Sequence, residues 1–193
     1  MKVSLFIYLI IFIFCMTCTD TSPASNPGSS SLYVEGNTMI ESDQQLEFNY
    51  CYPQNLVGSA FSFSDNMGKV FMIEMSATWC PGCYDDIPVG ETVYEHWKND
   101  DRVKIIHSLD DMGQPYTCTQ WGNAFTTSIP PIIDDGIENI IRGWFEVKPG
   151  GGVGGYPLTV FINSNMEIYK IHSGSTGMSF TAINEIIEEM LNN

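Results

Sequence analysis

Two cysteines three residues apart, Cys80 and Cys83, directly follow an apolar segment and precede a predicted helix. The segment 70–75 is apolar except for Glu74, which is typical of a central strand buried on both faces. The residues from 81 to about 98 favour a helix whose first residue is proline. A strand, a tight turn and a helix therefore have to meet at this cysteine pair.

Cys80 and Cys83 have the spacing of a redox-active pair, which can close a small disulfide ring. The first sulfur would lie at the N-terminus of the helix, where unpaired N–H groups and the helix dipole stabilise a thiolate. This predicts Cys80 as the attacking nucleophile and Cys83 as the thiol that resolves the mixed disulfide. A zinc site is one alternative, but zinc needs four ligands, and the chain has no second Cys-x-x-Cys and only three separate histidines. A buried structural disulfide is the other alternative.

The rest of the chain alternates between strand-like and helix-like segments. Further strands are predicted at 103–109, 158–162 and 167–171, and further helices at 116–125, 137–145 and 178–191. A glycine-rich loop occupies 150–155. This order predicts an α/β fold with a central mixed β-sheet flanked by helices.

The composition restricts the partners that the chain can bind. Its 193 residues carry 8 Lys and Arg against 23 Asp and Glu, which gives a formal net charge of −15. Such a charge argues against nucleic acid and against an electrostatic attachment to anionic lipid. The length favours one folded domain.

The N-terminus has the layout of a secretory signal. Lys2 precedes a twelve-residue apolar run, and Cys18 follows it, before a polar stretch rich in Ser, Pro and Gly. The segment resembles a bacterial lipoprotein signal, in which the cysteine after the cleavage site is acylated. We expect a signal peptide over 1–18 with Cys18 as lipid anchor, a flexible tether over 19–45 and a domain over 46–193. A secreted, unanchored protein and a retained N-terminal anchor are the alternatives.

Two motifs resemble the thioredoxin-like proteins of the exported, membrane-anchored thiol–disulfide oxidoreductase group (TlpA/ResA-like, related to the redoxins). The first is Ser-Ala-Thr-Trp-Cys-Pro-Gly-Cys at 76–83, preceded by Gly-Lys-Val-Phe-Met-Ile at 68–73. The second is Gly-Tyr-Pro-Leu-Thr-Val-Phe-Ile at 155–162. The resemblance covers roughly residues 55–193 and implies a thioredoxin-like fold with a central helical insertion.

The resemblance also implies substrate-contacting residues. Pro157 matches the cis-proline that faces the cysteine pair, and Tyr156 precedes it. Trp79, Pro81 and Gly82 belong to the motif around the cysteines and are expected to line the same substrate-binding surface.

Two acidic residues match functional positions of the family. Glu74 lies six residues before Cys80, where thioredoxins have a buried acid, and such a carboxyl could take the proton from Cys83 during exchange. Asp86 matches the Glu of the pattern Cys-x-x-x-Glu-x-Pro, although Asp is shorter. A solvent-facing position is the alternative for each residue.

The remaining cysteines and aromatic residues have less specific interpretations. Cys51 and Cys118 pair as a structural disulfide, or Cys118 serves as a redox partner, or both remain small buried hydrophobes. His107 is interpreted as structural. Four large aromatic residues are interpreted as core rather than as a substrate platform: Trp121, Phe125, Trp144 and Phe145.

Together these observations predict a protein-disulfide oxidoreductase in the periplasm or at the cell surface. Its expected partners are protein thiols or disulfides and an upstream electron donor or acceptor, and we expect a monomer with neither cofactor nor metal. A peroxiredoxin-like peroxidase is one alternative, but Ala77 occupies the position where that motif requires Thr or Ser. A thioredoxin-fold binding lipoprotein with a structural cysteine pair is the other.

Overall fold

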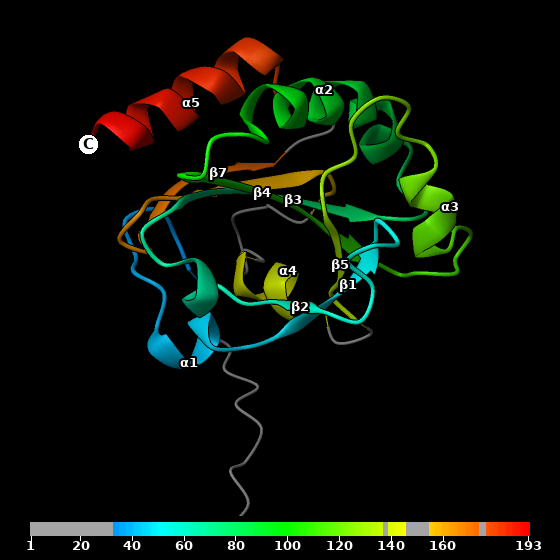
Figure 1. Ribbon diagram of the computed structural model, residues 1–193, viewed down its shortest axis with the longest axis horizontal. Helices are drawn as coiled ribbons and strands as arrows, with labels where there is room; N and C mark the ends of the chain where they lie inside the picture. Colours follow the sequence, from blue (N-terminus) through cyan, green and yellow to red (C-terminus); the bar gives the residue numbers. More distant parts are fainter. Residues whose placement is uncertain (1–32, 137–138, 146–154, 174–176) are drawn as a thin grey trace, which may run out of the picture.

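A seven-stranded mixed sheet forms the centre of the computed structural model, which describes residues 33–136, 139–145, 155–173 and 177–193 (Figure 1). The strands are β1 (Phe48–Tyr52), β2 (Ala60–Phe61), β3 (Val70–Ala77), β4 (Val103–Asp110), β5 (Ile132–Asp134), β6 (Leu158–Ile162) and β7 (Ile168–Ser173). Their order in the sheet is β2-β1-β5-β4-β3-β6-β7. Strands β3, β4 and β5 are parallel, whereas β1, β2, β6 and β7 pair antiparallel. The predicted α/β class with a mixed sheet is confirmed.

Strand β3 occupies the central position that its apolar sequence predicts. It pairs with β4 on one side and with β6 on the other, and all eight of its residues are buried. The parallel β3 and β4 are in register, so that Glu74 lies beside His107. Because Cys80 comes three residues after the end of β3, the cysteine pair lies at the carboxyl end of the parallel strands.

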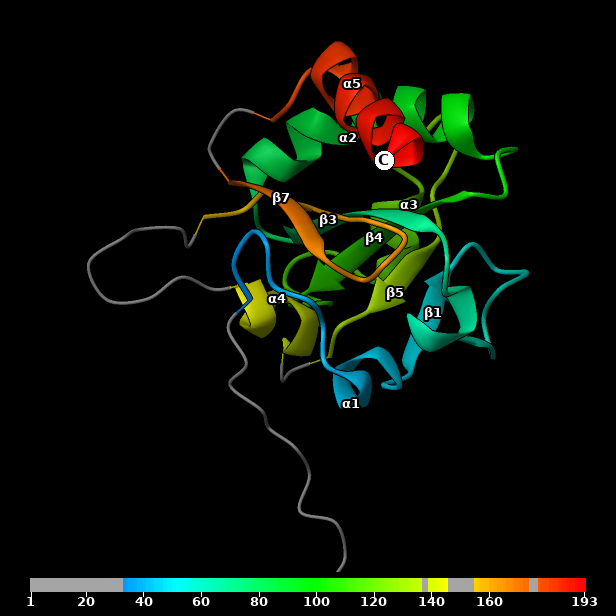
Figure 2. The ribbon, with the colours of Figure 1, turned by 90° about the vertical axis from the view of Figure 1, so that its left-hand side faces the viewer.

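Helices cover both faces of the sheet. Figures 1 and 2 show α2 (Pro81–Trp97) and α5 (Phe180–Asn192) together on one face and α4 (Ile140–Phe145) on the other. The short helix α3 (Cys118–Gly122) contacts β1 and β5. Helix α1 (Glu41–Gln44) and a 3₁₀ turn (Ser64–Asn66) complete the described elements.

Alternate residues of β3 enter two different hydrophobic cores, as strand geometry requires. Val70 and Met72 face α2 and α5, in a core that also holds Val93, Trp97, Ile183 and Ile187. Phe71, Ile73 and Met75 face the opposite side, with Trp144 and Phe145 of α4. The interpretation of the large aromatic residues as core is confirmed, because Trp121, Phe125, Trp144 and Phe145 are all at most 5% exposed.

Residues 33–45 belong to the folded domain, although we expected them in the flexible tether over 19–45. The Tyr33 ring is buried in the core beside α4, and its hydroxyl donates to Asp43 Oδ2 at 2.6 Å. Met39 is 2% exposed in the same core. The polar composition of 33–45 concealed these two apolar anchors.

Two helices differ in extent from the expectation. The helix predicted over 116–125 covers only Cys118–Gly122, because a Thr117–Gln120 capping box begins it late. The helix predicted over 137–145 begins at Ile140, because Asn139 is a turn residue with a φ of 47°; residues 137–138 lie outside the described residues.

Several predictions fall on residues that the structure does not describe. The signal peptide over 1–18, its Cys18, the tether over 19–32 and the glycine-rich loop over 150–154 all lie outside the described residues. Among the helices of residues 33–193 that are described, none has the length and apolar character needed to cross a bilayer.

Candidate active site

Cys80 and Cys83 form a disulfide at the start of α2. Cys80 is the N-cap residue, and its Sγ accepts the backbone N–H of Cys83 at 3.1 Å. Cys80 retains 5% exposure, whereas Cys83 is completely buried. In the reduced state the same N–H and the helix dipole would stabilise a thiolate on Cys80, and only that sulfur is within reach of a second molecule.

Glu74 lies inside the protein, so the alternative of a solvent-facing position is wrong. Its side chain points to the α2 face of the sheet, where Oε2 would be 3.3 Å from a Cβ at Gly90. Burial, reinforced by the nearby charge of Asp86, raises the pKa of Glu74 to about 8. At neutral pH the carboxyl is therefore protonated in the oxidised protein, which is the state that avoids a buried charge.

Asp86 lies beside Glu74 and is half-buried. It accepts the backbone N–H of Gly177, and both acids line one small cavity between α2 and α5. Burial and the charge of Asp85 raise the pKa of Asp86, although the bond from Gly177 opposes this shift. The structure therefore brings together the two acids that the sequence singled out.

His107, which the sequence analysis interprets as a structural residue, is a neighbour of Glu74. Its Nε2 accepts the indole N–H of Trp121 at 3.1 Å, and its Nδ1 lies 4.0 Å from Glu74 Oε1. Because burial lowers the pKa of His107 to about 3, the ring is neutral and carries its proton on Nδ1, toward Glu74. One signal was available in the sequence, because Glu74 and His107 are each the fifth residue of adjacent parallel strands.

The Tyr156-Pro157 peptide bond is cis, as the resemblance implies. Pro157 is buried, and the half-buried Tyr156 ring meets the Trp79 ring edge-on at 5.7 Å. The Tyr156 hydroxyl donates to Asp110, while the Arg142 guanidinium lies 4.5 Å from the centre of the Tyr156 ring. Burial, reinforced by the charge of Asp135, raises the pKa of Asp110. Tyr156 thus supports Trp79 from the side of the sheet that α4 covers.

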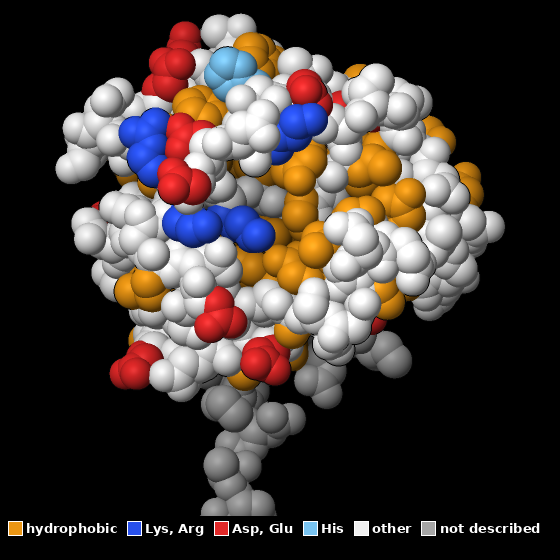
Figure 3. Space-filling model, viewed as in Figure 1, with side chains coloured by type: hydrophobic (Ala, Val, Ile, Leu, Met, Phe, Trp, Pro, Cys, Tyr) orange, Lys and Arg blue, Asp and Glu red, His pale blue; other side chains and the backbone are white. Residues whose placement is uncertain are grey.

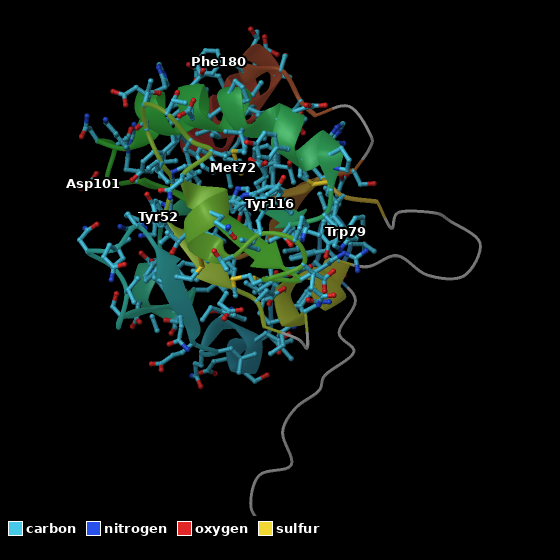
Figure 4. The ribbon with its side chains drawn as sticks, turned by 90° about the vertical axis from the view of Figure 1, so that its right-hand side faces the viewer. Tyr52, Met72, Trp79, Asp101, Tyr116 and Phe180 are labelled. Atoms are coloured by element: carbon cyan, nitrogen blue, oxygen red, sulfur yellow. A yellow bond between two sulfur atoms is a disulfide. The ribbon has the colours of Figure 1, made fainter. Side chains whose placement is uncertain are left out.

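A groove of about 510 Å³ opens next to Cys80. Its wall includes three aromatic side chains with large exposed fractions, Trp79 at 54%, Tyr84 at 47% and Tyr116 at 42%. Pro81 lines the groove as expected, whereas Gly82, Tyr156 and Pro157 are not part of its lining. Figure 4 shows Trp79 and Tyr116 on the same side of the molecule. Sequence reasoning missed Tyr84 and Tyr116, because exposure of an aromatic residue is a tertiary property.

Cys51 and Cys118 form the second disulfide, joining β1 to α3. Of the three interpretations that the sequence left open, the structure selects the pairing. Since Cys118 is 8% exposed and packs in the same hydrophobic cluster as Cys80, this disulfide fixes α3 next to the Cys80–Cys83 disulfide.

Comparison with known proteins agrees with this geometry. No family model matches the chain. The chain is 27% identical over 135 residues to the thiol–disulfide oxidoreductase ResA of Halalkalibacterium halodurans, and the match covers 70% of each sequence. A thioredoxin-family thiol:disulfide interchange protein of Chlorobium tepidum superimposes with a TM-score of 0.56 and 22% identity, over 69% of this chain and 88% of that one.

A second solved structure, the exposed lipoprotein thioredoxin of Streptococcus pneumoniae, gives a TM-score of 0.55 at 21% identity. It covers 75% of this chain and 98% of its own. The chain therefore has a thioredoxin-like fold and is similar in sequence to ResA, in agreement with the resemblance found from its motifs.

Proposed function

We propose that this protein is an extracytoplasmic thiol–disulfide oxidoreductase that exchanges its Cys80–Cys83 pair with protein substrates. The observation that carries the proposal is the asymmetry of the pair. Cys80 borders an open groove and caps a helix, whereas Cys83 is completely buried. An attacking thiol has to be accessible to the substrate, and a resolving thiol has to be near the attacking one, so the two positions fit these two roles.

The exchange transfers two electrons in two steps. In the reducing direction, the Cys80 thiolate attacks one sulfur of a substrate disulfide, forms a mixed disulfide and releases the other substrate sulfur as a thiolate. Cys83 then loses its proton and attacks Cys80 Sγ, which closes the Cys80–Cys83 disulfide and releases the second substrate thiol. The oxidising direction is the reverse, and the upstream electron donor or acceptor decides between them.

Glu74 is the proposed proton acceptor for Cys83. With a pKa near 8, about a tenth of the Glu74 carboxyl is ionised at pH 7, and this fraction is basic enough to take a thiol proton. Asp86 shares its cavity and adjusts this basicity through charge, since an ionised Asp86 makes a proton on Glu74 more favourable.

The chain is also proposed to act outside the cytoplasm as a monomeric, membrane-anchored lipoprotein. The support is the apolar run ahead of Cys18 and the likeness to the pneumococcal lipoprotein thioredoxin. Cleavage before Cys18 and its acylation would leave residues 19–32 as a tether between the lipid and the domain.

An insulin-reduction assay tests the activity, with the Cys80→Ser and Cys83→Ser variants as a matched pair. We expect wild-type protein with dithiothreitol to accelerate precipitation of the insulin B chain, and both variants to lose this activity. Only Cys83→Ser should accumulate mixed disulfides with exported proteins, because its Cys80 still attacks. Wild-type protein without activity, together with Cys83→Ser that traps nothing, would exclude the proposed function.

A further inference from the structure

The groove beside Cys80 contains a cluster of aromatic rings that thiol chemistry does not require. The ring centres of Tyr84 and Tyr116 lie 6.3 Å apart, and that of Trp121 lies 5.8 Å from Tyr84 and 6.4 Å from Tyr116. Tyr84 and Tyr116 are open to solvent, whereas Trp121 is 1% exposed and closes the cluster from below. The inference drawn here rests on the proposed function and concerns the substrates of this site.

The cluster is held in place from several directions. Thr78 Oγ1 lies 2.6 Å from the carbonyl oxygen of Asp111 and 2.9 Å from that of Gln114, which fastens the loop leading to Tyr116. The capping box of α3 and the Cys51–Cys118 disulfide then fix the helix that carries Trp121. Since Tyr84 projects from α2, all three rings stand on anchored backbone, and little conformational entropy is lost when a ligand binds.

The charge around the cluster is negative. Asp85 lines the groove, and Asp111 accepts the indole N–H of Trp79 at 2.6 Å, so its carboxylate also lies at this rim. No Lys or Arg among the described residues lines the groove.

Several cations instead lie at the other end of the parallel strands. Lys69, Lys98 and Lys104 surround a separate hollow there, and Figure 3 shows Lys and Arg side chains gathered on that face.

We propose that the groove binds a cationic side chain, Lys or Arg, of the substrate polypeptide close to its reactive cysteine. Aromatic faces attract a cation through their quadrupole, and a nearby carboxylate adds to this attraction. A purely apolar segment would use the rings but gain nothing from Asp85, and an acidic segment would be repelled. Since Cys80 and the rings border one groove, the cationic residue lies within a few residues of the substrate cysteine.

A second copy of this chain is a poor occupant of the groove. Each chain carries a formal charge of −15, so two copies repel one another at low salt. A basic segment of another protein, in contrast, is attracted by both the overall charge and the local one. The ring cluster then favours binding of that segment in the groove over binding at other acidic surfaces of the protein.

The test uses short peptides of one sequence, each with a single cysteine joined in a mixed disulfide to thionitrobenzoate. The residue two positions after the cysteine is Arg, citrulline, Leu or Glu, and citrulline keeps the shape of Arg without its charge. The reduced full-length protein releases coloured thionitrobenzoate, and the second-order rate constant is measured for each peptide. We expect the Arg peptide to react roughly tenfold faster than the citrulline peptide, and the Glu peptide slowest.

Three variants locate the effect. Asp85→Asn, Tyr84→Leu and Tyr116→Leu should each lower the ratio of the Arg rate to the citrulline rate severalfold. Asp101→Asn is the matched control, because this exposed residue lies far from the groove (Figure 4) and removes the same charge. The ratio should keep its wild-type value in Asp101→Asn.

The outcomes separate this inference from the proposed function. Failure of the reduced protein to react with any of the peptides would contradict the oxidoreductase function itself. Equal rates for Arg and citrulline, or a preference for Leu, would overturn the cationic specificity and leave the activity intact. An Arg preference that is unchanged in all three groove variants would reflect the overall charge of the protein, and would also overturn the site.

Discussion

Replacing Glu74 by Gln gives the most quantitative test of the buried acid, because it removes one titration and little else. Gln has nearly the same volume and cannot ionise. Its side-chain oxygen can still face the Nδ1–H of His107, as Glu74 Oε1 does at 4.0 Å. The variant should therefore fold as the wild type does, with a different dependence of stability on pH.

The size of the difference follows from the pKa of Glu74. Burial raises this pKa from 4.5 in the unfolded chain to about 8 in the folded protein. Between these values the folded state holds a proton that the unfolded state has released, so the stability of the wild type falls as the pH rises. One pKa unit corresponds to about 1.4 kcal/mol, so from pH 5 to pH 7.5 the Glu74 contribution falls by about 3 kcal/mol.

Other buried groups titrate over the same pH range, so the quantity to measure is the difference in free energy of unfolding between Glu74→Gln and wild type. The pKa of His107 is lowered to about 3 by burial, which makes stability rise with pH up to the ordinary histidine pKa. The raised pKa of Asp110 acts in the opposite direction. Both contributions are common to the wild type and Glu74→Gln, and they cancel in the difference.

The assay is urea unfolding of the oxidised proteins at half-unit steps between pH 5 and pH 8. We expect the stability of Glu74→Gln, relative to wild type, to increase by about 3 kcal/mol between pH 5 and pH 7.5. A difference that stays constant over this range would show that Glu74 titrates normally, and the argument for a buried proton acceptor would fail.

Glu91→Gln is the matched control, since Glu91 is as buried as Glu74 but has hydrogen-bond donors. Although burial opposes the shift, N–H groups of Thr126 and Thr127 lower the pKa of Glu91. When the pKa of a carboxyl is lower in the folded state than in the unfolded state, its ionised form stabilises the fold at every pH above the unfolded-state pKa. This stabilisation is lost as the pH falls through the folded-state pKa. Glu91→Gln should thus be less stable than wild type by a constant amount across pH 5 to 8.

Three further predictions concern the cysteines. Alkylation of the reduced protein at mildly acidic pH, followed by peptide mass spectrometry, should label Cys80 long before Cys83; equal labelling would contradict the assignment of the nucleophile. Replacing Cys51 and Cys118 together by Ala should lower the free energy of unfolding by about 4 kcal/mol, the value expected for opening a loop of this length, and an unchanged urea midpoint would refute this. Cys18→Ala should abolish labelling by a fatty-acid analogue in growing cells, and persistent labelling would place the lipid elsewhere.

The sequence predicted those parts of the protein that depend on neighbouring residues. The apolar run of β3, the proline that begins α2 and the short apolar run of β6 each specify a local conformation, and each element lies where it was expected. The Cys80–Cys83 ring belongs to this class, because three residues and a helix start are enough to bring the sulfurs together. Motif resemblance then extended the prediction to the cis bond before Pro157.

The arrangement around the cysteines was decided by contacts between distant segments. Nothing in the pattern of residues 33–45 distinguishes a tether from a packed segment until Tyr33 meets the core beside α4. The pairing of Cys51 with Cys118 likewise depends on where α3 packs against β1.

By itself, then, the sequence determined the fold class and the redox pair, since local periodicity and a short motif are sufficient for both. Motif resemblance singled out Glu74 but left open whether its side chain is buried. Only the tertiary structure showed that Glu74 is buried, with His107 Nδ1 4.0 Å from its carboxyl, and only it assembled Tyr84, Tyr116 and Trp121 beside Cys80. The physical reason is that burial and proximity are properties of the packed chain. A side chain acquires a shifted pKa or an exposed aromatic face only when segments from different parts of the sequence exclude water around it, or leave it open.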